Sequence, residues 1–251
     1  MDPAPTSMII PYIFRPVGEW RFLREPTGDG STEEEPSVVL DWCTAAAAVL
    51  ESHDLLRVER VDFTGWIGPD PEGQTEARRS QTVVFLTRPG FRAAEFRTAC
   101  EGELARLVKE VPGSRFSDSL YVFGSGTVFN AEGKKVHLPL VTWIHGSLLG
   151  GPYLQVRTQC DAFLPYTLLA EPQPEVYARN APRLEAALRE IEAVLGVPAE
   201  PEEVTRYAVA DGLRLRNHHS GDEIVDAVAA REVEDIRAGE AQWAESFRKS
   251  P

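Results

Sequence analysis

The stretch at residues 55–67, LLRVERVDFTGWI, decides the fold class of this chain, because apolar and charged side chains alternate along it. Leu56, Val58 and Val61 are separated by charged neighbours, which is the pattern of a strand with one buried face. The Gly-Pro-Asp-Pro-Glu-Gly segment that follows predicts a turn, and residues 81–87, QTVVFLT, predict a returning strand. We therefore expect a β-hairpin.

Amphipathic helices flank this hairpin on both sides. On the N-terminal side, Ser37 can cap a helix that runs to about His53. On the C-terminal side, residues 91–111 carry apolar side chains at helical spacing, and a Pro-Gly pair ends the pattern. The hairpin thus lies between two predicted helices.

Further strands are predicted before and after these helices. Residues 8–14 favour an edge strand, whereas residues 20–36 are too polar to pack and predict a loop. Residues 119–161 contain short alternating runs joined by turn residues, which predicts an antiparallel meander. Within it, Gly124-Ser125-Gly126 is expected to form a hairpin turn, and residues 136–145 are expected to form one strand.

The element order β-α-β-β-α-β predicts an α+β protein. We expect an antiparallel sheet with helices packed on one face, a split β-α-β-like start and a helical C-terminal third, in which residues 174–195 and 222–247 form helices. We expect a single domain, 1–251. In it, residues 1–199 form the α+β core and residues 200–251 form an acidic helical extension packed on that core.

The formal net charge is −13 at pH 7. Such a molecule repels phosphate backbones, so we expect no nucleic-acid partner. An acidic surface instead steers a basic protein partner toward it. The alternative explanation is that moderate acidity keeps a cytosolic protein in solution.

The cysteine content and the hydropathy pattern point to the cytoplasm. The chain has three cysteines, far apart and odd in number, which argues against a disulfide framework. Its longest apolar runs fall well short of the roughly 20 residues that span a bilayer, so we expect no contact with a membrane. The N-terminus has no basic segment followed by an apolar one.

No linear motif for catalysis, metal binding or nucleotide binding is present. Gly124-Ser125-Gly126 has the wrong spacing for a nucleophile elbow, and no phosphate-binding glycine pattern opens a helix. His218 and His219, beside Asp222 and Glu223, are the best metal candidates, but such a loop pair is more often solvated. We expect no catalytic residue, no metal, no cofactor and no enzymatic activity.

The last predicted strand, residues 153–161 (YLQVRTQCD), has one polar face that is wet or binds something. The run of three acids before the first helix could complement a basic groove, or could simply favour the positive end of that helix. A thiol, imidazole and carboxylate set from Cys160, His145 and Asp161 is conceivable, but a buried thiol also explains the pattern. The candidate partner-binding residues are Glu33, Glu34, Glu35, Tyr153, Arg157 and Asp161.

Residues 161–196, DAFLPYTLLAEPQPEVYARNAPRLEAALREIEAVLG, form the most distinctive segment. A polar strand ending in Asp and a Pro-Tyr pair precede a Pro-x-Pro-Glu-Val-Tyr-Ala-x-Asn-Ala-Pro-x-Leu helix entry. In this entry Asn180 can cap the helix, and Pro182 suits an early helical position where the long part begins. The segment resembles uncharacterised acidic proteins of GC-rich bacteria, which look like the immunity proteins that accompany secreted or injected toxins. The resemblance covers about a seventh of the chain and carries no site residue with it.

Two functional hypotheses follow. The first is a cytoplasmic immunity-type protein that binds and neutralises a cognate bacterial toxin, with a basic toxin domain as partner of its acidic surface. The alternative is a small-molecule-binding protein or enzyme with a pocket between sheet and helices, lined by polar groups such as Tyr153, Arg157 and Asp161.

Overall fold

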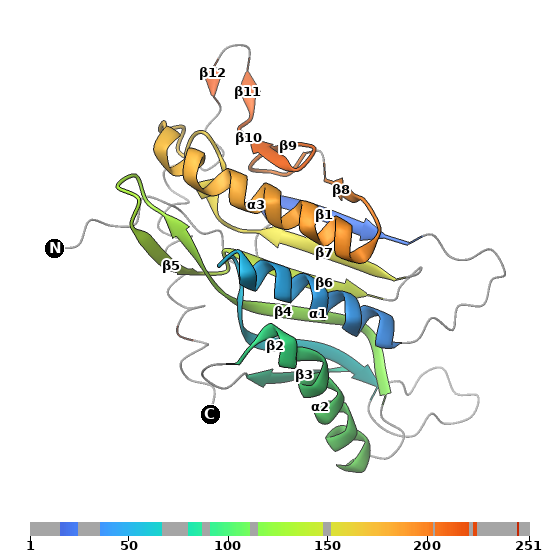
Figure 1. The fold of residues 1–251 in the computed structure, drawn as a ribbon. Coiled ribbons are helices and arrows are strands. Elements are labelled where there is room, and N and C mark those ends of the chain that lie inside the picture. Colours follow the sequence, from blue (N-terminus) through green and yellow to red (C-terminus); the bar gives the residue numbers. More distant parts are fainter. Residues whose placement is uncertain are drawn as a thin grey trace.

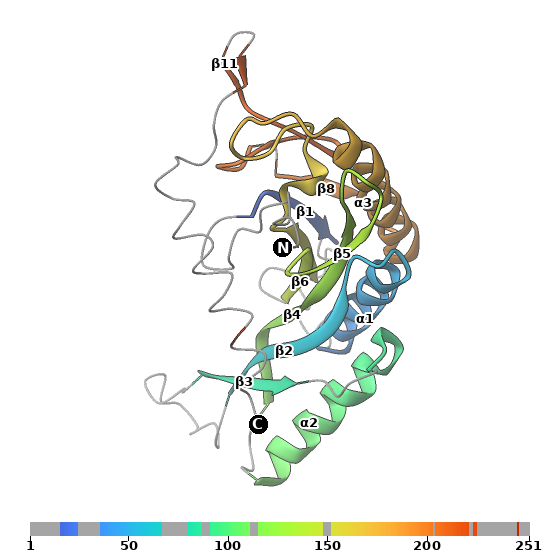
Figure 2. The same cartoon turned by 90° about the vertical axis from the view of Figure 1, so that its left-hand side faces the viewer.

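The computed structural model describes residues 16–24, 36–66, 80–86, 91–110, 115–147, 152–202, 204–220, 223–224 and 245. These residues form an α+β fold built on one large antiparallel sheet, as the sequence predicts (Figure 1). Figure 2 shows that the three α-helices cover the same face of this sheet. No described helix is both long enough and apolar enough to cross a membrane.

The helical elements are α1 (Pro36–Ser52), η1 (Ala93–Glu95), α2 (Phe96–Glu110), η2 (Asp161–Phe163) and α3 (Pro174–Leu195). The strands of the main sheet are β1 (Gly18–Leu23), β2 (Arg57–Trp66), β3 (Ser80–Leu86), β4 (Arg115–Phe129), β5 (Lys135–Pro139), β6 (Thr142–Ser147), β7 (Tyr153–Thr158) and β8 (Ala199–Pro201). Two small hairpins follow, formed by β9 (Val209–Asp211) with β10 (Arg214–Arg216) and by β11 (His219–Ser220) with β12 (Glu223–Ile224).

The main sheet has the strand order β3-β2-β4-β6-β7-β1-β8, and β5 pairs with β4 outside this path. Each neighbouring pair is antiparallel. Strands β1 and β2, which flank α1 in the chain, therefore run in the same direction with β4, β6 and β7 between them. The start of the chain is thus a split β-α-β unit, as predicted.

The hairpin and its two flanking helices are confirmed. Strands β2 and β3 pair from Arg60 opposite Leu86 to Trp66 opposite Ser80. Helix α1 begins one residue before the predicted cap, and α2 follows the short helix η1 within the predicted range.

The core lies between the sheet and the helices. Helix α1 packs closely on β6, because a Cβ added at Gly146 would lie 2.6 Å from both Cys43 Sγ and a Val39 methyl group. Helix α3 contributes a buried stripe at the predicted spacing. The largest fully buried side chains include Trp20, Phe22, Phe96, Phe163, Leu50 and Leu55.

The prediction of a loop at residues 20–36 is wrong for its first residues, which belong to β1. Trp20 and Phe22 belong to β1 and have no exposed surface. They alternate with Glu19 and Arg21, which is itself the pattern of a half-buried strand. The strand expected at residues 8–14 lies outside the described residues.

The turn expected at Gly124-Ser125-Gly126 is not formed, because these residues belong to β4. These residues lie inside a single strand of 15 residues that pairs with β2 on one side and with β6 and β5 on the other. Glycine is required at positions 124 and 126 because the backbone of residues 55–57 lies very close to them. A Cβ at Gly124 would overlap the carbonyl oxygen of Arg57, and one at Gly126 would overlap that of Leu55.

The single strand expected at residues 136–145 is in fact two strands, β5 and β6. Leu140 between them has a φ of 51°, in the left-handed region that L residues rarely occupy. Its N–H donates to the Gly124 carbonyl oxygen at 2.8 Å, which fixes the bend. His137 and His145 therefore lie on different strands.

Helix α3 is continuous through Pro182, so this proline does not mark the start of a long part. Asn180 does not cap the helix either. Its side chain is buried, donates to the Phe129 carbonyl oxygen at 2.8 Å and accepts the Phe129 N–H at 2.9 Å. The predicted end is confirmed, because Gly196 caps α3 with a φ of 69°.

The described residues between 199 and 224 contain short strands rather than a helical extension. Strand β8 pairs with β1, so the boundary expected at residue 199 falls inside a strand of the main sheet. The helix expected at residues 222–247 is replaced at its start by β12. Glu245 is helical, and the rest of that range lies outside the described residues.

Candidate functional site

Two of the predicted partner-binding residues, Tyr153 and Arg157, lie on the face of the sheet that the helices do not cover. Strand β7 places them there because they alternate with Leu154 and Val156, which belong to the core. Asp161 is not part of this group. Glu33, Glu34 and Glu35 lie outside the described residues.

Polar side chains from three adjacent strands form a connected row on this face. The Arg157 Nε atom lies 2.8 Å from Glu19 Oε2 on β1. The other oxygen of Glu19 accepts a hydrogen bond from Gln155 Nε2, and Gln155 Oε1 lies 3.0 Å from His145 Nδ1 on β6. The strand register places these residues opposite one another, since Glu19 pairs with Arg157 and His145 pairs with Gln155.

This row fixes the protonation pattern of His145. The amide oxygen of Gln155 can only accept, so Nδ1 of the neutral imidazole carries the proton and Nε2 keeps its lone pair. In the described part of the structure, Nε2 is buried without a hydrogen-bond partner. His145 is therefore prepared to accept a hydrogen bond at Nε2.

Aromatic rings surround the polar row. The His145 ring stacks on Tyr121 with centroids 4.4 Å apart and an interplanar angle of 3°. Tyr153 meets the same imidazole edge-on at 5.8 Å, and the guanidinium of Arg157 lies 4.8 Å from the centre of the Trp143 ring. Tyr121 and Tyr153 thus hold the imidazole in place, and Trp143 holds the guanidinium.

Burial shifts the pKa of two groups in this row, Glu19 and His145, and of the neighbouring Tyr153. Desolvation raises the pKa of Glu19 above its ordinary value, although the Arg157 charge opposes the shift. Desolvation, helped by the Arg157 charge, lowers the pKa of His145, although the hydrogen bond with Gln155 works against it. Desolvation raises the pKa of Tyr153 to about 12, so its hydroxyl stays protonated.

Asp161 has a scaffold role in the loop before α3. It has no exposed surface, and its carboxylate accepts the Leu168 N–H at 3.3 Å. Its carbonyl oxygen accepts hydrogen bonds from Gln173 Nε2 at 2.7 Å and from the Leu164 N–H at 2.9 Å. Direct contact between Asp161 and a partner protein is therefore ruled out in this conformation.

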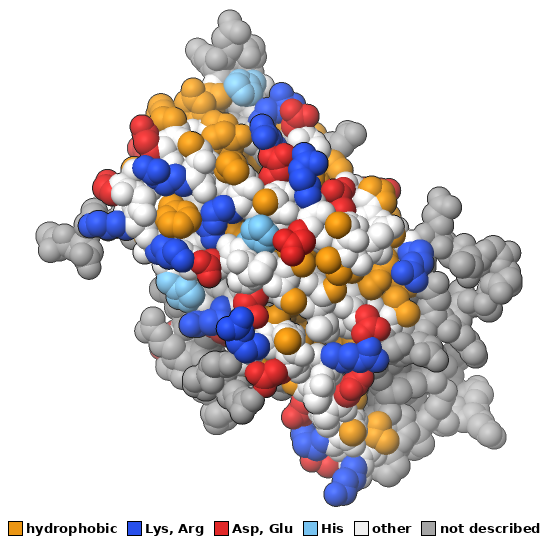
Figure 3. Space-filling model, viewed as in Figure 1, with side chains coloured by type: hydrophobic (Ala, Val, Ile, Leu, Met, Phe, Trp, Pro, Cys, Tyr) orange, Lys and Arg blue, Asp and Glu red, His pale blue; other side chains and the backbone are white. Residues whose placement is uncertain are grey.

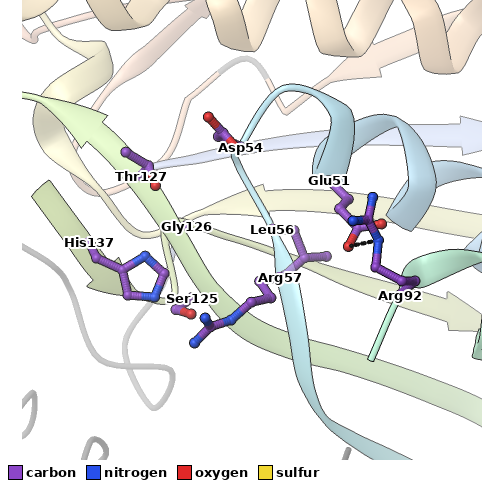
Figure 4. A pocket seen from close by; sticks show the side chains of 9 residues that line it. All are labelled: Glu51, Asp54, Leu56, Arg57, Arg92, Ser125, Gly126, Thr127 and His137. Carbon is purple, nitrogen blue, oxygen red and sulfur yellow. Dashed lines mark ion pairs between the residues drawn. The ribbon is translucent and has the colours of Figure 1, made fainter. Parts of the chain in front are cut away.

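A half-open pocket of about 300 Å³ lies where the end of α1 meets β2, β4 and β5 (Figure 4). It is not formed by the polar residues that the sequence singled out for a pocket. Its lining is mostly polar and charged, and consists of Glu51, Asp54, Leu56, Arg57, Arg92, Ser125, Gly126, Thr127 and His137.

The pocket floor comes from the glycine-containing stretch of β4. Gly126 lets the strand lie directly against Leu55, which places Ser125 and Thr127 beside the end of α1. Ser125 is buried, and its hydroxyl donates to the Glu59 carboxylate. Sequence reasoning missed this site, although the unusual Gly-Ser-Gly stretch between β-favouring residues was its signal.

Charges of both signs surround the pocket. Glu51 pairs with Arg92 at 3.1 Å, and Asp54 pairs with Lys135 at 2.7 Å. The hydrogen bond from Lys135 lowers the pKa of Asp54, so this carboxylate remains ionised. Desolvation, followed by the charge of Arg57, lowers the pKa of His137 and favours the neutral imidazole.

Of the candidate metal ligands His218, His219, Asp222 and Glu223, Asp222 lies outside the described residues. His218 Nε2 lies 3.0 Å from the Thr205 carbonyl oxygen, and His219 is in β11. Among the residues that the structure describes, no three His, Cys, Asp or Glu side chains are placed to hold a metal ion. Cys160 is buried, and its Sγ accepts the Ala162 N–H at 3.5 Å. This agrees with the expectation of a buried thiol.

Comparison with known proteins gives no match to any family model, curated protein or solved structure.

Proposed function

We propose that this protein binds and neutralises a basic partner protein, as toxin-immunity proteins do. The observation that carries the proposal is the formal charge of −13, which attracts a basic partner at long range and raises the association rate. The resemblance at residues 161–196 supports the same class of function.

The described surface suggests where such a partner would dock. On the face shown in Figure 3, acidic and basic side chains are interspersed and no large patch has one sign. Helix α2, at one end of the helical layer in Figures 1 and 2, has three glutamates and three basic side chains, and Asp41 of α1 adds a fourth carboxylate beside it. Its Arg97 lies between Asp41 and Glu101, and its Arg106 lies between Glu103 and Glu110.

Each of these arginines therefore forms ion pairs with two carboxylates. Asp41, Glu101 and Glu110 have side chains that are 52%, 51% and 55% exposed, so their charge reaches solvent. Val108 on the same helix is 45% exposed. The exposed carboxylates and this exposed apolar side chain are the groups that a basic partner would contact.

The test is co-expression with any secreted-toxin gene that lies beside this gene in its native genome, with host survival and purified-complex kinetics as readouts. We expect survival, and we expect the triple reversal Asp41→Lys, Glu101→Lys and Glu110→Lys to lower the association rate about tenfold or more at low salt. A matched triple reversal, Glu190→Lys, Asp211→Lys and Glu202→Lys, changes the net charge equally and should have a smaller effect.

Equal effects of the two triple variants would place the attraction in the whole-molecule charge rather than in α2. Failure of the wild-type chain to protect the host, or to bind the toxin, would refute the proposed function.

A further inference from the structure

Among the described strands of the main sheet, three lie at an edge: β3 and β8 at the two ends of the strand order, and β5 beside β4. Within the part of the chain that the structure describes, each of them pairs with a single neighbour. The open side of an edge strand presents unpaired backbone N–H and C=O groups, so it can accept another strand. Natural sheets therefore protect their edges, and these three strands differ in that respect.

Strands β5 and β8 carry the usual protection. Strand β5 begins with Lys135 and ends with Pro139, and β8 has only three residues and ends with Pro201. A charged side chain, a proline or a very short length each discourage further pairing at an edge. Neither strand is therefore suited to binding another strand.

Strand β3 has none of these features. Its seven residues, SQTVVFL, include no charged residue and no proline, and its centre, TVVF, consists of residues that favour strands. Its pairing with β2 runs without a shift from Leu86 to Ser80, whereas the pairing of β2 with β4 is interrupted by two shifts. The open side of β3 is thus a regular row of backbone groups without a bulge.

The charge of the chain argues against a second copy as the occupant of this edge. Two molecules with a net charge of −13 repel each other. In the sequence, Arg78 and Arg79 precede β3, and Arg88 follows it. Antiparallel pairing of two β3 strands would bring the arginines before one strand toward the arginine after the other. The edge is therefore better suited to a segment of a different protein.

We propose that β3 binds an extended segment of the partner protein as an added strand, so that the main sheet continues into the partner. The inference rests on the proposed function for the existence of this partner. Backbone hydrogen bonds supply the affinity, and an uncharged segment rich in threonine, valine or isoleucine matches the centre of β3. Strand β3 and helix α2 lie at the same end of the molecule in Figures 1 and 2, so one partner can contact both.

A short synthetic peptide of alternating threonine and valine, labelled with fluorescein, tests the proposal. The peptide is N-methylated at every second residue, which blocks one of its edges against aggregation and leaves the other edge free to pair. The comparison peptide is N-methylated at every residue and has no amide donor. In fluorescence anisotropy, we expect the first peptide to bind the full-length protein about tenfold or more tightly than the second.

Hydrogen exchange locates the bound peptide on the wild-type protein. We expect added protection within residues 80–86 when the first peptide is present, and no added protection within residues 135–139 of the edge strand β5. This measurement does not depend on any variant being folded.

Two neighbouring variants, Val83→Pro and Val84→Pro, separate the two sides of β3. Successive N–H groups along an antiparallel strand point to opposite sides, so one proline removes a hydrogen bond to β2 and the other removes a donor from the open edge. We expect one variant to have a clearly lower melting temperature. The other should melt closer to the wild type and bind the first peptide about tenfold more weakly.

The proposal is overturned if the first peptide does not bind, if both peptides bind equally, or if neither proline variant changes the affinity. Full protection of β3 before any peptide is added would also overturn it, because the edge would already be paired. None of these results depends on protection from a toxin. If the peptide binds at β3 but the chain neutralises no toxin, strand addition stands and the proposed function fails, and the reverse result overturns strand addition alone.

Discussion

Gly126 has no room for a side chain, because an added Cβ would overlap the Leu55 carbonyl oxygen. We expect Gly126→Ala to lower the free energy of unfolding by about 3 kcal/mol, since the β2 and β4 backbones would have to separate. Denaturant unfolding measures this loss. Gly102→Ala is the control. It lies in α2 with nothing within 4 Å of the added atom, and should stabilise the protein by about 0.5–1 kcal/mol.

A similar response of the two glycine variants would contradict the close approach of β4 to Leu55. The pair therefore distinguishes the steric effect from the general cost of a glycine.

His145 makes stability depend on pH. Its pKa in the folded protein is below the ordinary value of 6.5, so the unfolded chain binds a proton more readily than the folded chain. The stabilisation from the neutral imidazole is complete above pH 6.5 and is lost as the pH falls toward the lower, folded-state pKa. Glu19, whose pKa is raised, has the opposite effect. Its contribution to the stability of the protein is lost as the pH rises above 4.5, the ordinary pKa of the group.

The comparison of wild type with His145→Asn isolates the imidazole, because Glu19 is present in both. We expect the stability advantage of the wild type to shrink between about pH 8 and pH 5. Denaturant unfolding across this range gives the measurement, and a constant difference would show that His145 titrates normally.

At the level of elements, α3 is attached to β4 by Asn180. The side-chain amide makes a two-way contact with the N–H and the carbonyl oxygen of Phe129, at the end of the strand. We expect Asn180→Ala to cost about 1–3 kcal/mol of unfolding free energy, because both backbone groups lose their partner.

Arg179→Ala is the matched control on the same helix. Arg179 is exposed and makes one long contact, at 3.4 Å, to the Ala131 carbonyl oxygen. Its removal should change the free energy of unfolding by less than about 0.5 kcal/mol. Equal losses for both variants would mean that Asn180 contributes only as a helical residue.

The elements that the sequence predicts well are those with a local cause. The hairpin at residues 55–67 and 81–87, and the helix at residues 174–195, follow from alternation or from a periodic apolar stripe. The errors occur where a distant contact decides the structure. Residues 136–145 bend at Leu140 because its N–H bonds Gly124, a contact that no local pattern reveals.

The sites are predictable only in part for the same reason. Alternation along β7 predicts that Tyr153 and Arg157 lie on one face of the sheet. It does not predict that Glu19 and His145 lie beside them, because that depends on β1 and β6 being the neighbours of β7. The pocket depends on three segments meeting at the end of α1, which the sequence indicates only through its glycines.

For the whole molecule, residues 199–216 are part of the structure rather than an appendage. Trp20 Nε1 donates to the Gly212 carbonyl oxygen at 3.0 Å, and Tyr207 and Leu215 are each only 2% exposed. We expect a chain that ends at residue 198 to lose cooperative thermal unfolding, since each of these side chains contributes about 1.5–3 kcal/mol of burial. A truncated chain with the wild-type melting temperature would refute this.

The late pairing of β1 also affects how the chain folds in a cell. Among the described residues its partners are β7 and β8, which are translated much later than β1. While the ribosome is still making these segments, β2, β3 and β4 can already form a sheet, but Trp20 and Phe22 have nowhere to be buried. The nascent chain therefore exposes the apolar side chains of β1 until β7 has been synthesised.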